Sequence, residues 1–270
     1  MTDPNGSIPP DLPPELPPEL PARLPAELPS RSPARTPAPH DGAEPRPTLI
    51  RLVYQALRND LISARLVPGA RLRIQALSAR YACGVIPLRE ALNRLTAEGW
   101  VHHSEQRGFL AAPVTADDAM DLCEARLLMS EAALTASINR GDSVWEERVI
   151  VAYHRVRKVP RYESTEPPMG NPHFDEPHRA FHMALVSACG SQRMLAALEQ
   201  MFLHAERYRA FARRIELSDP DADHRELMDA ALDRDVAKAV ALAREHILRP
   251  AQVVVEALRT LPITSNRSKG

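Results

Sequence analysis

The sequence predicts a mainly α-helical protein with two folded parts. Three short helices and a hairpin are expected over residues 48–112, and an antiparallel bundle of six to seven helices over residues 113–258. Aromatic residues make up only 4% of the chain, while Ala, Leu and Arg are abundant, which favours helices over sheets. Apolar residues recur at helical spacing, and glycine and proline separate the periodic segments.

Both ends of the chain are predicted to be disordered tails. Residues 1–47 contain 15 of the 26 prolines, and residues 12–29 repeat a short Leu-Pro-(Pro/Ala)-Glu unit. Proline at this density prevents helices and sheet ladders and leaves extended, solvated chain. A docking ligand for a proline-binding partner is the alternative for this segment. Residues 259–270 form the second predicted tail.

The first folded part begins with three predicted helices, over residues 49–64, 74–81 and 87–98. Pro87 stands in the first turn of the third helix, where its missing N–H costs nothing. Two short strands are then expected over residues 100–103 and 108–111, on either side of a polar turn. Three short helices followed by a hairpin are typical of the winged helix-turn-helix arrangement.

The second folded part is predicted to be all-helical, because no strand signal is found from Thr115 onward. Thr115 can cap the first long helix, and the main loop is expected at the proline-rich residues 166–173. Such a series of helices forms a bundle domain of about 140 residues. The predicted helices span residues 117–139, 143–158, 175–188, 191–216, 221–233 and 235–258.

Charge is distributed unevenly between the two parts. The whole chain has a formal net charge of −1, whereas residues 48–112 contain nine arginines and four acidic residues, a local net charge of +5. This asymmetry indicates an anionic partner for the first part alone.

Cysteine usage and hydropathy bound the compartment. Cys83, Cys123 and Cys189 are far apart and odd in number, which fits buried thiols in a reducing compartment rather than a disulfide framework. No apolar run approaches the length that spans a bilayer, and the N-terminus lacks the pattern of a signal peptide. We therefore expect a cytoplasmic protein without a membrane partner.

The first part resembles the GntR family of bacterial transcriptional regulators. The resemblance rests on an ungapped pattern of about 40 residues, and it implies binding to double-stranded DNA. The third helix then enters the major groove, and the second helix and the wing add contacts. The landmarks are Pro68-Gly69, Leu72, Leu77, residues 87–92 (PLREAL), Arg94-Leu95 and residues 98–101 (EGWV). The DNA-binding residues that the resemblance implies are Arg89, Gln75, Arg94, Arg107 and Gly108.

Arg89 is the strongest of these candidates, because it lies in the first turn of the third helix. There it can fork to a guanine or bind a phosphate. The alternative is a surface ion pair with Glu90 or Glu98. The sequence departs from the family just before the proline, where Val85 stands at the position of an arginine that often reads bases. Apolar contact with a thymine methyl can replace that arginine.

Four histidines have informative spacing. His178 and His182 are four residues apart on one helix face, and His224 and His246 fall on two successive helices. A histidine pair at this spacing is a ready chelate, and two more histidines from neighbouring helices would complete a site inside a bundle. Spacing alone leaves the alternative of solvated or hydrogen-bonded histidines open.

The second part resembles the FCD domain, the helical sensor of FadR-type GntR regulators. Phe181-His182, His224, His246 and residues 231–235 match its signature, while His178 stands where the family usually has Asp. The resemblance implies a divalent transition metal on the four histidines. Four nitrogen ligands favour Zn²⁺ or Ni²⁺ over Mg²⁺ or Ca²⁺. An unmetallated polar pocket is the alternative, and Asp175 is a weaker additional candidate ligand.

In this domain family the metal helps to hold an organic acid, and arginines neutralise the rest of its charge. The residues that would bind the effector are Arg126 and Arg207; an exposed arginine is the alternative for each. Residues 80–89, 178–182, 189–191 and 207–209 look like those of the carbon-starvation branch, which includes a glutarate-responsive repressor. A small dicarboxylate such as glutarate is therefore the favoured effector.

Together these features predict a homodimeric regulator on a palindromic operator, a repressor released by a small carboxylate, and not an enzyme. Two alternatives remain open at this point. One is a helical-bundle metalloenzyme with a four-histidine site, against which no acidic residue is placed as a general base. The other is a DNA-binding protein that needs no ligand.

Overall fold

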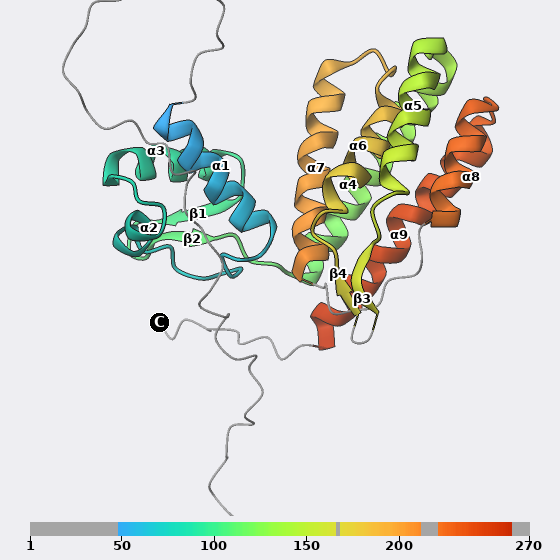
Figure 1. The fold of residues 1–270 in the computed structure, drawn as a ribbon. Coiled ribbons are helices and arrows are strands. Elements are labelled where there is room, and N and C mark those ends of the chain that lie inside the picture. The colour runs from blue at the N-terminus through green and yellow to red at the C-terminus, as the bar shows by residue number, and fades with distance from the viewer. Residues whose placement is uncertain (1–47, 166–167, 212–220, 261–270) are drawn as a thin grey trace, which may run out of the picture.

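The computed structural model describes residues 48–165, 168–211 and 221–260, and it has the two parts that the sequence predicts (Figure 1). The predicted tail at residues 1–47 and all but the first two residues of the predicted tail at residues 259–270 lie outside the described residues. Within the described residues, no helix combines the length and the apolar character needed to cross a membrane. The fold class, a winged helix-turn-helix followed by a helical bundle, is confirmed.

The first part, which we call the head, contains three helices and one two-stranded sheet. The predicted bounds hold to within two residues. Thr48 caps the first helix, since its side-chain oxygen accepts a hydrogen bond from the N–H of Arg51 at 3.3 Å. The elements are α1 (Leu49–Ile62), α2 (Ile74–Arg80), α3 (Val85–Ala97), β1 (Val101–Ser104) and β2 (Gly108–Ala111).

The core of the head fixes the third helix against the first. Leu88, Leu92 and Leu95 share one face of α3 and are fully buried, because residues three and four apart lie together on a helix. They pack into one cluster with Val53 and Leu57 of α1. The opposite face of α3 is therefore left toward solvent.

The second part, the bundle, consists of six helices among the described residues. Thr115 caps its first helix, as predicted, by accepting a hydrogen bond from the N–H of Asp118 at 3.2 Å. The two longest helices, α4 and α9, lie against each other (Figure 1). The helices are α4 (Ala116–Arg140), α5 (Ser143–Val156), α6 (Asp175–Val186), α7 (Gln192–Phe211), α8 (Asp221–Leu232) and α9 (Val236–Thr260).

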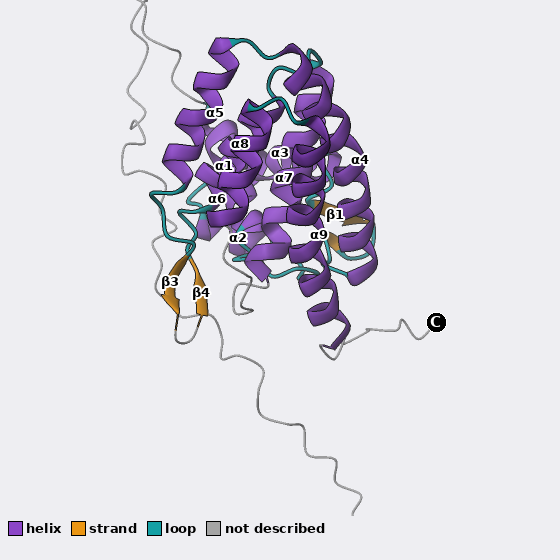
Figure 2. Ribbon diagram, turned by 90° about the vertical axis from the view of Figure 1, so that its right-hand side faces the viewer, coloured by secondary structure: helices purple, strands orange, loops and turns teal. Residues whose placement is uncertain are grey.

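Two predictions for the bundle are wrong. The segment between α5 and α6 is not purely a loop, since it forms the antiparallel hairpin β3 (Tyr162–Thr165) and β4 (Pro168–Gly170) (Figure 2). The hairpin is closed at its base, where the N–H of Asn171 donates to the carbonyl of Arg161 at 2.8 Å. The last helix also extends to Thr260, two residues beyond the predicted end of the bundle.

Candidate functional site

The four histidines singled out from the sequence come together inside the bundle. α6 supplies His178 and His182, α8 supplies His224, and α9 supplies His246. One ring nitrogen from each lies within 4.8 Å of those of the other three. The Nε2 atom of His178 is 3.2 Å from Nε2 of His182 and 3.4 Å from Nε2 of His246. Three helices thus converge on one cluster, which we call the histidine cluster.

Burial keeps this cluster in the form that binds metals. Removal from water lowers the pKa of His178, His182 and His246 well below its usual range, and the neighbouring histidines and arginines lower it further. These three imidazoles are therefore neutral at neutral pH, and a neutral imidazole offers a lone pair to a cation.

The donor set fits a divalent transition metal. Metal–nitrogen bonds of about 2.0–2.1 Å place neighbouring tetrahedral ligands about 3.3 Å apart, which matches the two short nitrogen–nitrogen distances. Hydrogen bonds alone do not explain why Nε2 of His178 lies close to both His182 and His246. This atom carries either one proton or one lone pair, so it can form a good hydrogen bond with only one of the two nitrogens. A shared cation would satisfy all three. That these four histidines bind a metal stays a prediction.

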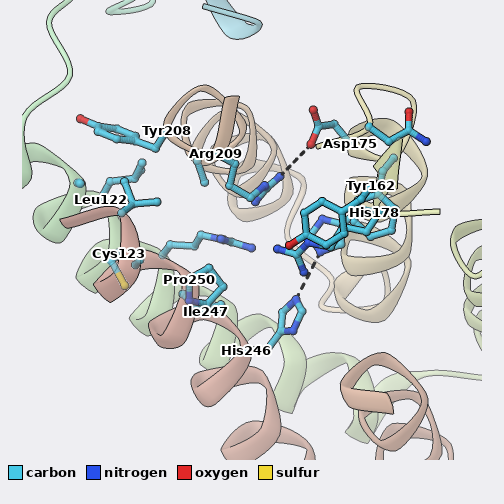
Figure 3. A pocket seen from close by; sticks show the side chains of 18 residues that line it. Leu122, Cys123, Tyr162, Asp175, His178, Tyr208, Arg209, His246, Ile247 and Pro250 are labelled. Carbon is cyan, nitrogen blue, oxygen red and sulfur yellow. Dashed lines mark hydrogen bonds and ion pairs between the residues drawn. The ribbon is translucent and has the colours of Figure 1, made fainter. Parts of the chain in front are cut away.

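A small cavity of about 100 Å³ opens beside the histidine cluster (Figure 3). Asp175 and His178 lie on one wall, and Leu122, Cys123 and Ile247 lie on the opposite wall. Apart from the histidines, its polar lining includes three arginines, Arg126, Arg161 and Arg209. The arrangement suits a small anionic ligand beside a metal.

Arg126 lies deep in this cavity, with 6% of its surface exposed. Its guanidinium packs 4.0 Å above the ring of Phe202, which in turn stacks on His182. Burial and the nearby charge of Arg209 lower the pKa of Arg126 to about 9, so the group is still charged at neutral pH. No ion pair to Arg126 is found within the described residues, and its buried Nε has no hydrogen-bond partner there.

The second arginine singled out from the sequence lies elsewhere. Arg207 is buried and donates a hydrogen bond to the carbonyl of Ala112, and it is not among the residues that line the cavity. Arg209, two positions further along α7, lines the cavity instead and lies 3.9 Å from Asp175 (Figure 3). Arg209, Arg161, Tyr162 and Asn171 are cavity residues that the sequence did not single out.

On the head, four of the five DNA-binding candidates are exposed, among them Arg94 on α3. Arg89 on α3, Gln75 on α2 and Arg107 in the turn between β1 and β2 are all exposed. Gly108 follows Arg107 with φ of +70°, a conformation that suits glycine and turns the backbone at the hairpin tip. Arg89 forms no ion pair with Glu90 or Glu98 in the described part of the chain, and Glu98 pairs with Arg94 and Arg58 instead.

Arg94 is exposed but interacts with two residues of the head. Its Nε lies 3.1 Å from Glu98, and its guanidinium packs 3.9 Å above the ring of Tyr54. The pair with Glu98 uses the Nε of Arg94, so the terminal N–H groups of this exposed guanidinium stay available to a DNA phosphate. In contrast, Val85 and Ile86 at the start of α3 expose 45% and 74% of their surface, although both are apolar.

Helix α7 joins the head to the bundle. His204 stacks on Trp100 of the head with ring centroids 3.9 Å apart and planes 6° apart. Leu203 is buried in the same core cluster as the residues of the head, and Gln200 accepts a hydrogen bond from Arg58. Residues 200, 203, 204 and 207 thus form one helix face against the head, while Phe202, Ala205 and Arg209 lie by the cavity and the histidine cluster.

Comparison with known proteins decides the family. A family model described as "Bacterial regulatory proteins, gntR family" matches residues 49–110, and one described as "FCD domain" matches residues 121–249. The chain belongs to the GntR family. Its FCD domain places it with the FadR-type members.

Two relatives that align over most of their length support the same family assignment. The chain is 36% identical over 211 residues to the HTH-type transcriptional repressor GlaR of Escherichia coli K12, an alignment that covers 76% of this chain and 95% of the relative. It is 35% identical over 214 residues to the HTH-type transcriptional regulator BphR of Paraburkholderia xenovorans LB400, with 77% and 85% covered.

A solved structure supports the fold. A putative GntR transcriptional regulator from Rhodococcus sp. RHA1 superposes with a TM-score of 0.63 at 21% identity, covering 77% of this chain and 98% of that one. This likeness bears on the fold alone. The family assignment makes the protein a DNA-binding transcriptional regulator and not an enzyme, so the metalloenzyme alternative is set aside.

The contact between the head and the FCD domain should depend on pH through His204. Burial lowers the pKa of His204 from its usual value of 6.5, so the unfolded chain binds a proton at higher pH than the native protein does. Protonation of His204 in the unfolded chain therefore lowers the free energy of unfolding as the pH falls below 6.5. We expect the Tm of His204→Phe, which keeps a ring on Trp100, to fall less than that of the wild type between about pH 7.5 and about pH 5.5. Equal slopes for the two proteins would contradict this assignment.

Proposed function

We propose that this GntR regulator is a repressor that binds a palindromic operator as a homodimer. It leaves the operator when a small dicarboxylate, with glutarate as the favoured candidate, binds in the FCD cavity beside zinc or nickel. The relative named repressor GlaR supports repression as the mode of action. The observation that carries the ligand class is the buried, charged Arg126 next to the histidine cluster.

The buried charge of Arg126 indicates an anionic ligand, because no acidic residue among the described ones neutralises it. A buried charge is stable only when it is paired or hydrogen-bonded, and the described residues offer Arg126 no ion pair. A carboxylate placed between Arg126 and a metal on the histidine cluster would compensate both charges. His178, His182, His224 and His246 would hold the metal, and a carboxylate would bind it by expanding its coordination from four ligands to five.

DNA recognition would use the exposed side of the head. Arg89 and Gln75 would enter the major groove, and Arg107 on the wing would reach the minor groove or a phosphate. The exposed Val85 and Ile86 at the start of α3 support apolar contact with thymine methyl groups, in place of an arginine. Since one winged helix covers one half-site, two copies related by a two-fold axis would cover a palindrome.

Helix α7 would transmit the signal between the two sites. A ligand that draws Arg209 and the Phe202 region toward the cavity acts on the helix whose opposite face holds His204 against Trp100. The ligand must prefer one arrangement of α7 over the other, because only differential affinity shifts an equilibrium. The preferred arrangement would set the two recognition helices at a spacing that no longer fits the operator.

Calorimetry tests the ligand class. We expect glutarate to bind the zinc-loaded wild-type protein, and Arg126→Gln to weaken this binding by about 10- to 100-fold through loss of charge-assisted hydrogen bonds. The exposed Arg193→Gln on α7 is the matched control and should bind as the wild type does. A wild-type protein that binds none of malonate, succinate, glutarate and adipate would overturn the proposal.

A further inference from the structure

A short backbone segment just before α2 is paired with the wing hairpin β1–β2. Arg71 forms an isolated antiparallel bridge with Leu110 of β2. Two backbone hydrogen bonds of 2.8 and 2.9 Å flank this bridge, from Leu72 to Phe109 and from Ala111 to Ala70. This is the pattern of an antiparallel ladder, so the hairpin fixes the backbone of the segment.

The alternation of side chains along this segment turns its two arginines outward. Successive side chains of an extended segment point to opposite faces, and the backbone is still extended at Arg73, with φ of −75° and ψ of 117°. Leu72 is buried in the core of the head, whereas Arg71 and Arg73 on either side of it are exposed. Because the pairing is antiparallel, two residues onward from Arg71 correspond to two residues back from Leu110. Arg73 therefore lies level with Gly108, at the tip of the wing.

Arg73 stands between two elements of the head that are proposed to contact DNA. It precedes Gln75 of α2 by two positions, and in register it lies beside the wing turn that carries Arg107. The side chain of Arg73 does not cap α2, and it forms no ion pair with any residue that the structure describes. The wing turn also carries one acidic residue, the exposed Glu105. The guanidinium of Arg73 is therefore available to an anion from outside the head.

A phosphate group suits this position better than a base edge does. Arg73 lies beside the wing rather than on α3, the helix that is proposed to enter the major groove. An arginine at such a position meets the sugar–phosphate backbone that borders the groove, and its planar fork binds a phosphate with two charge-assisted hydrogen bonds. Contacts of this kind carry no sequence information, but they fix the register and the orientation of a protein on the duplex.

We propose that Arg73 binds a phosphate of the DNA backbone between the wing and α2. This contact holds the head in the orientation in which Arg89 of α3 faces the bases. The inference rests on the proposed mode of DNA recognition, and it is independent of the metal and of the effector. Because the contact is made to the backbone, it stabilises the complexes with operator and non-operator DNA alike.

The test measures how the DNA affinity of the full-length protein depends on salt, by fluorescence anisotropy between about 50 and about 200 mM KCl. Each phosphate contact contributes about 0.9 to the slope of log K against log salt concentration. We expect Arg73→Gln to reduce the slope by about 0.9 for each copy bound, so the wild type loses about 3.5-fold more affinity over this range for each copy. Arg73→Lys keeps the charge and should keep the wild-type slope. The exposed Arg155→Gln on α5 is the matched control and should keep it as well.

A second DNA duplex without the operator sequence separates a phosphate contact from a base contact. Arg73→Gln should weaken binding to both duplexes by the same factor, and the Tm of each variant checks that it is folded. A wild-type slope in folded Arg73→Gln would overturn the inference, and so would a loss of affinity confined to the operator. Both results leave the proposed role of Arg89 and the release by a carboxylate standing. If the wild type binds neither duplex at the lowest salt concentration, the proposed function fails and the inference fails with it.

Discussion

Replacing His182 with alanine is expected to lower the zinc affinity of the purified protein by about 100- to 1,000-fold. Structural zinc sites with four ligands bind with about 10–16 kcal/mol, so one ligand of four accounts for roughly 2.5–4 kcal/mol. His182 is buried and its Nε2 lies 3.2 Å from Nε2 of His178, which makes it a central member of the histidine cluster. Competition with a chromophoric chelator measures the change.

The control for this experiment is His173→Ala, an exposed residue just before α6 that lies outside the histidine cluster. It should bind zinc as the wild type does. Zinc should also raise the Tm of the wild type and of His173→Ala, but should have little effect on that of His182→Ala, because only a ligand that binds the native state stabilises it. Unchanged zinc affinity in a folded His182→Ala protein would contradict the metal site.

Replacing Arg89 with alanine is expected to weaken operator binding by about 30-fold to about 20,000-fold. A forked arginine contact with guanine contributes about 1–3 kcal/mol, and the proposed dimer on a palindrome would lose it twice. The side chain is exposed and forms no ion pair within the described ranges, so its removal should leave the Tm almost unchanged. Fluorescence anisotropy with labelled operator DNA at fixed salt gives the affinity.

Arg89→Lys separates two roles of this residue. A lysine keeps the charge but not the fork, so it should restore binding if Arg89 contacts a phosphate and should fail to restore it if Arg89 reads a base. The matched control is Arg155→Ala, an exposed arginine on α5 in the FCD domain. If Arg89→Ala binds the operator as tightly as the wild type does, α3 is not the recognition helix.

The helices could be predicted from the sequence because their signals are local. Thr48 and Thr115 cap α1 and α4, and apolar spacing gives the buried face of each helix. The hairpin β3–β4 could not be predicted in this way. Its strands have only four and three residues, and Pro168 and Gly170 within it are typical of loops. A tertiary arrangement, rather than local propensity, makes this segment a hairpin.

The histidine cluster could be anticipated because spacing and family resemblance both point to it, whereas the arginines of the cavity could not. Arg207 and Arg209 are two positions apart, so they lie about 200° apart around α7. Which of them faces the cavity depends on how α7 is rotated against the head, through the stack of His204 on Trp100. That contact joins residues far apart in sequence and leaves no local signal.

Release of DNA by a dicarboxylate would couple the FCD cavity to the DNA-binding head in a single measurement. An operator selected from a random DNA pool is bound by the zinc-loaded protein, and glutarate is titrated while anisotropy is followed. We predict that glutarate lowers operator affinity by about 5- to 150-fold, the usual range of allosteric coupling. The double variant His182→Ala/His246→Ala should show no such response. If dicarboxylates bind but leave the operator affinity unchanged, or if the double variant releases DNA equally well, a dicarboxylate at the histidine cluster does not control DNA binding.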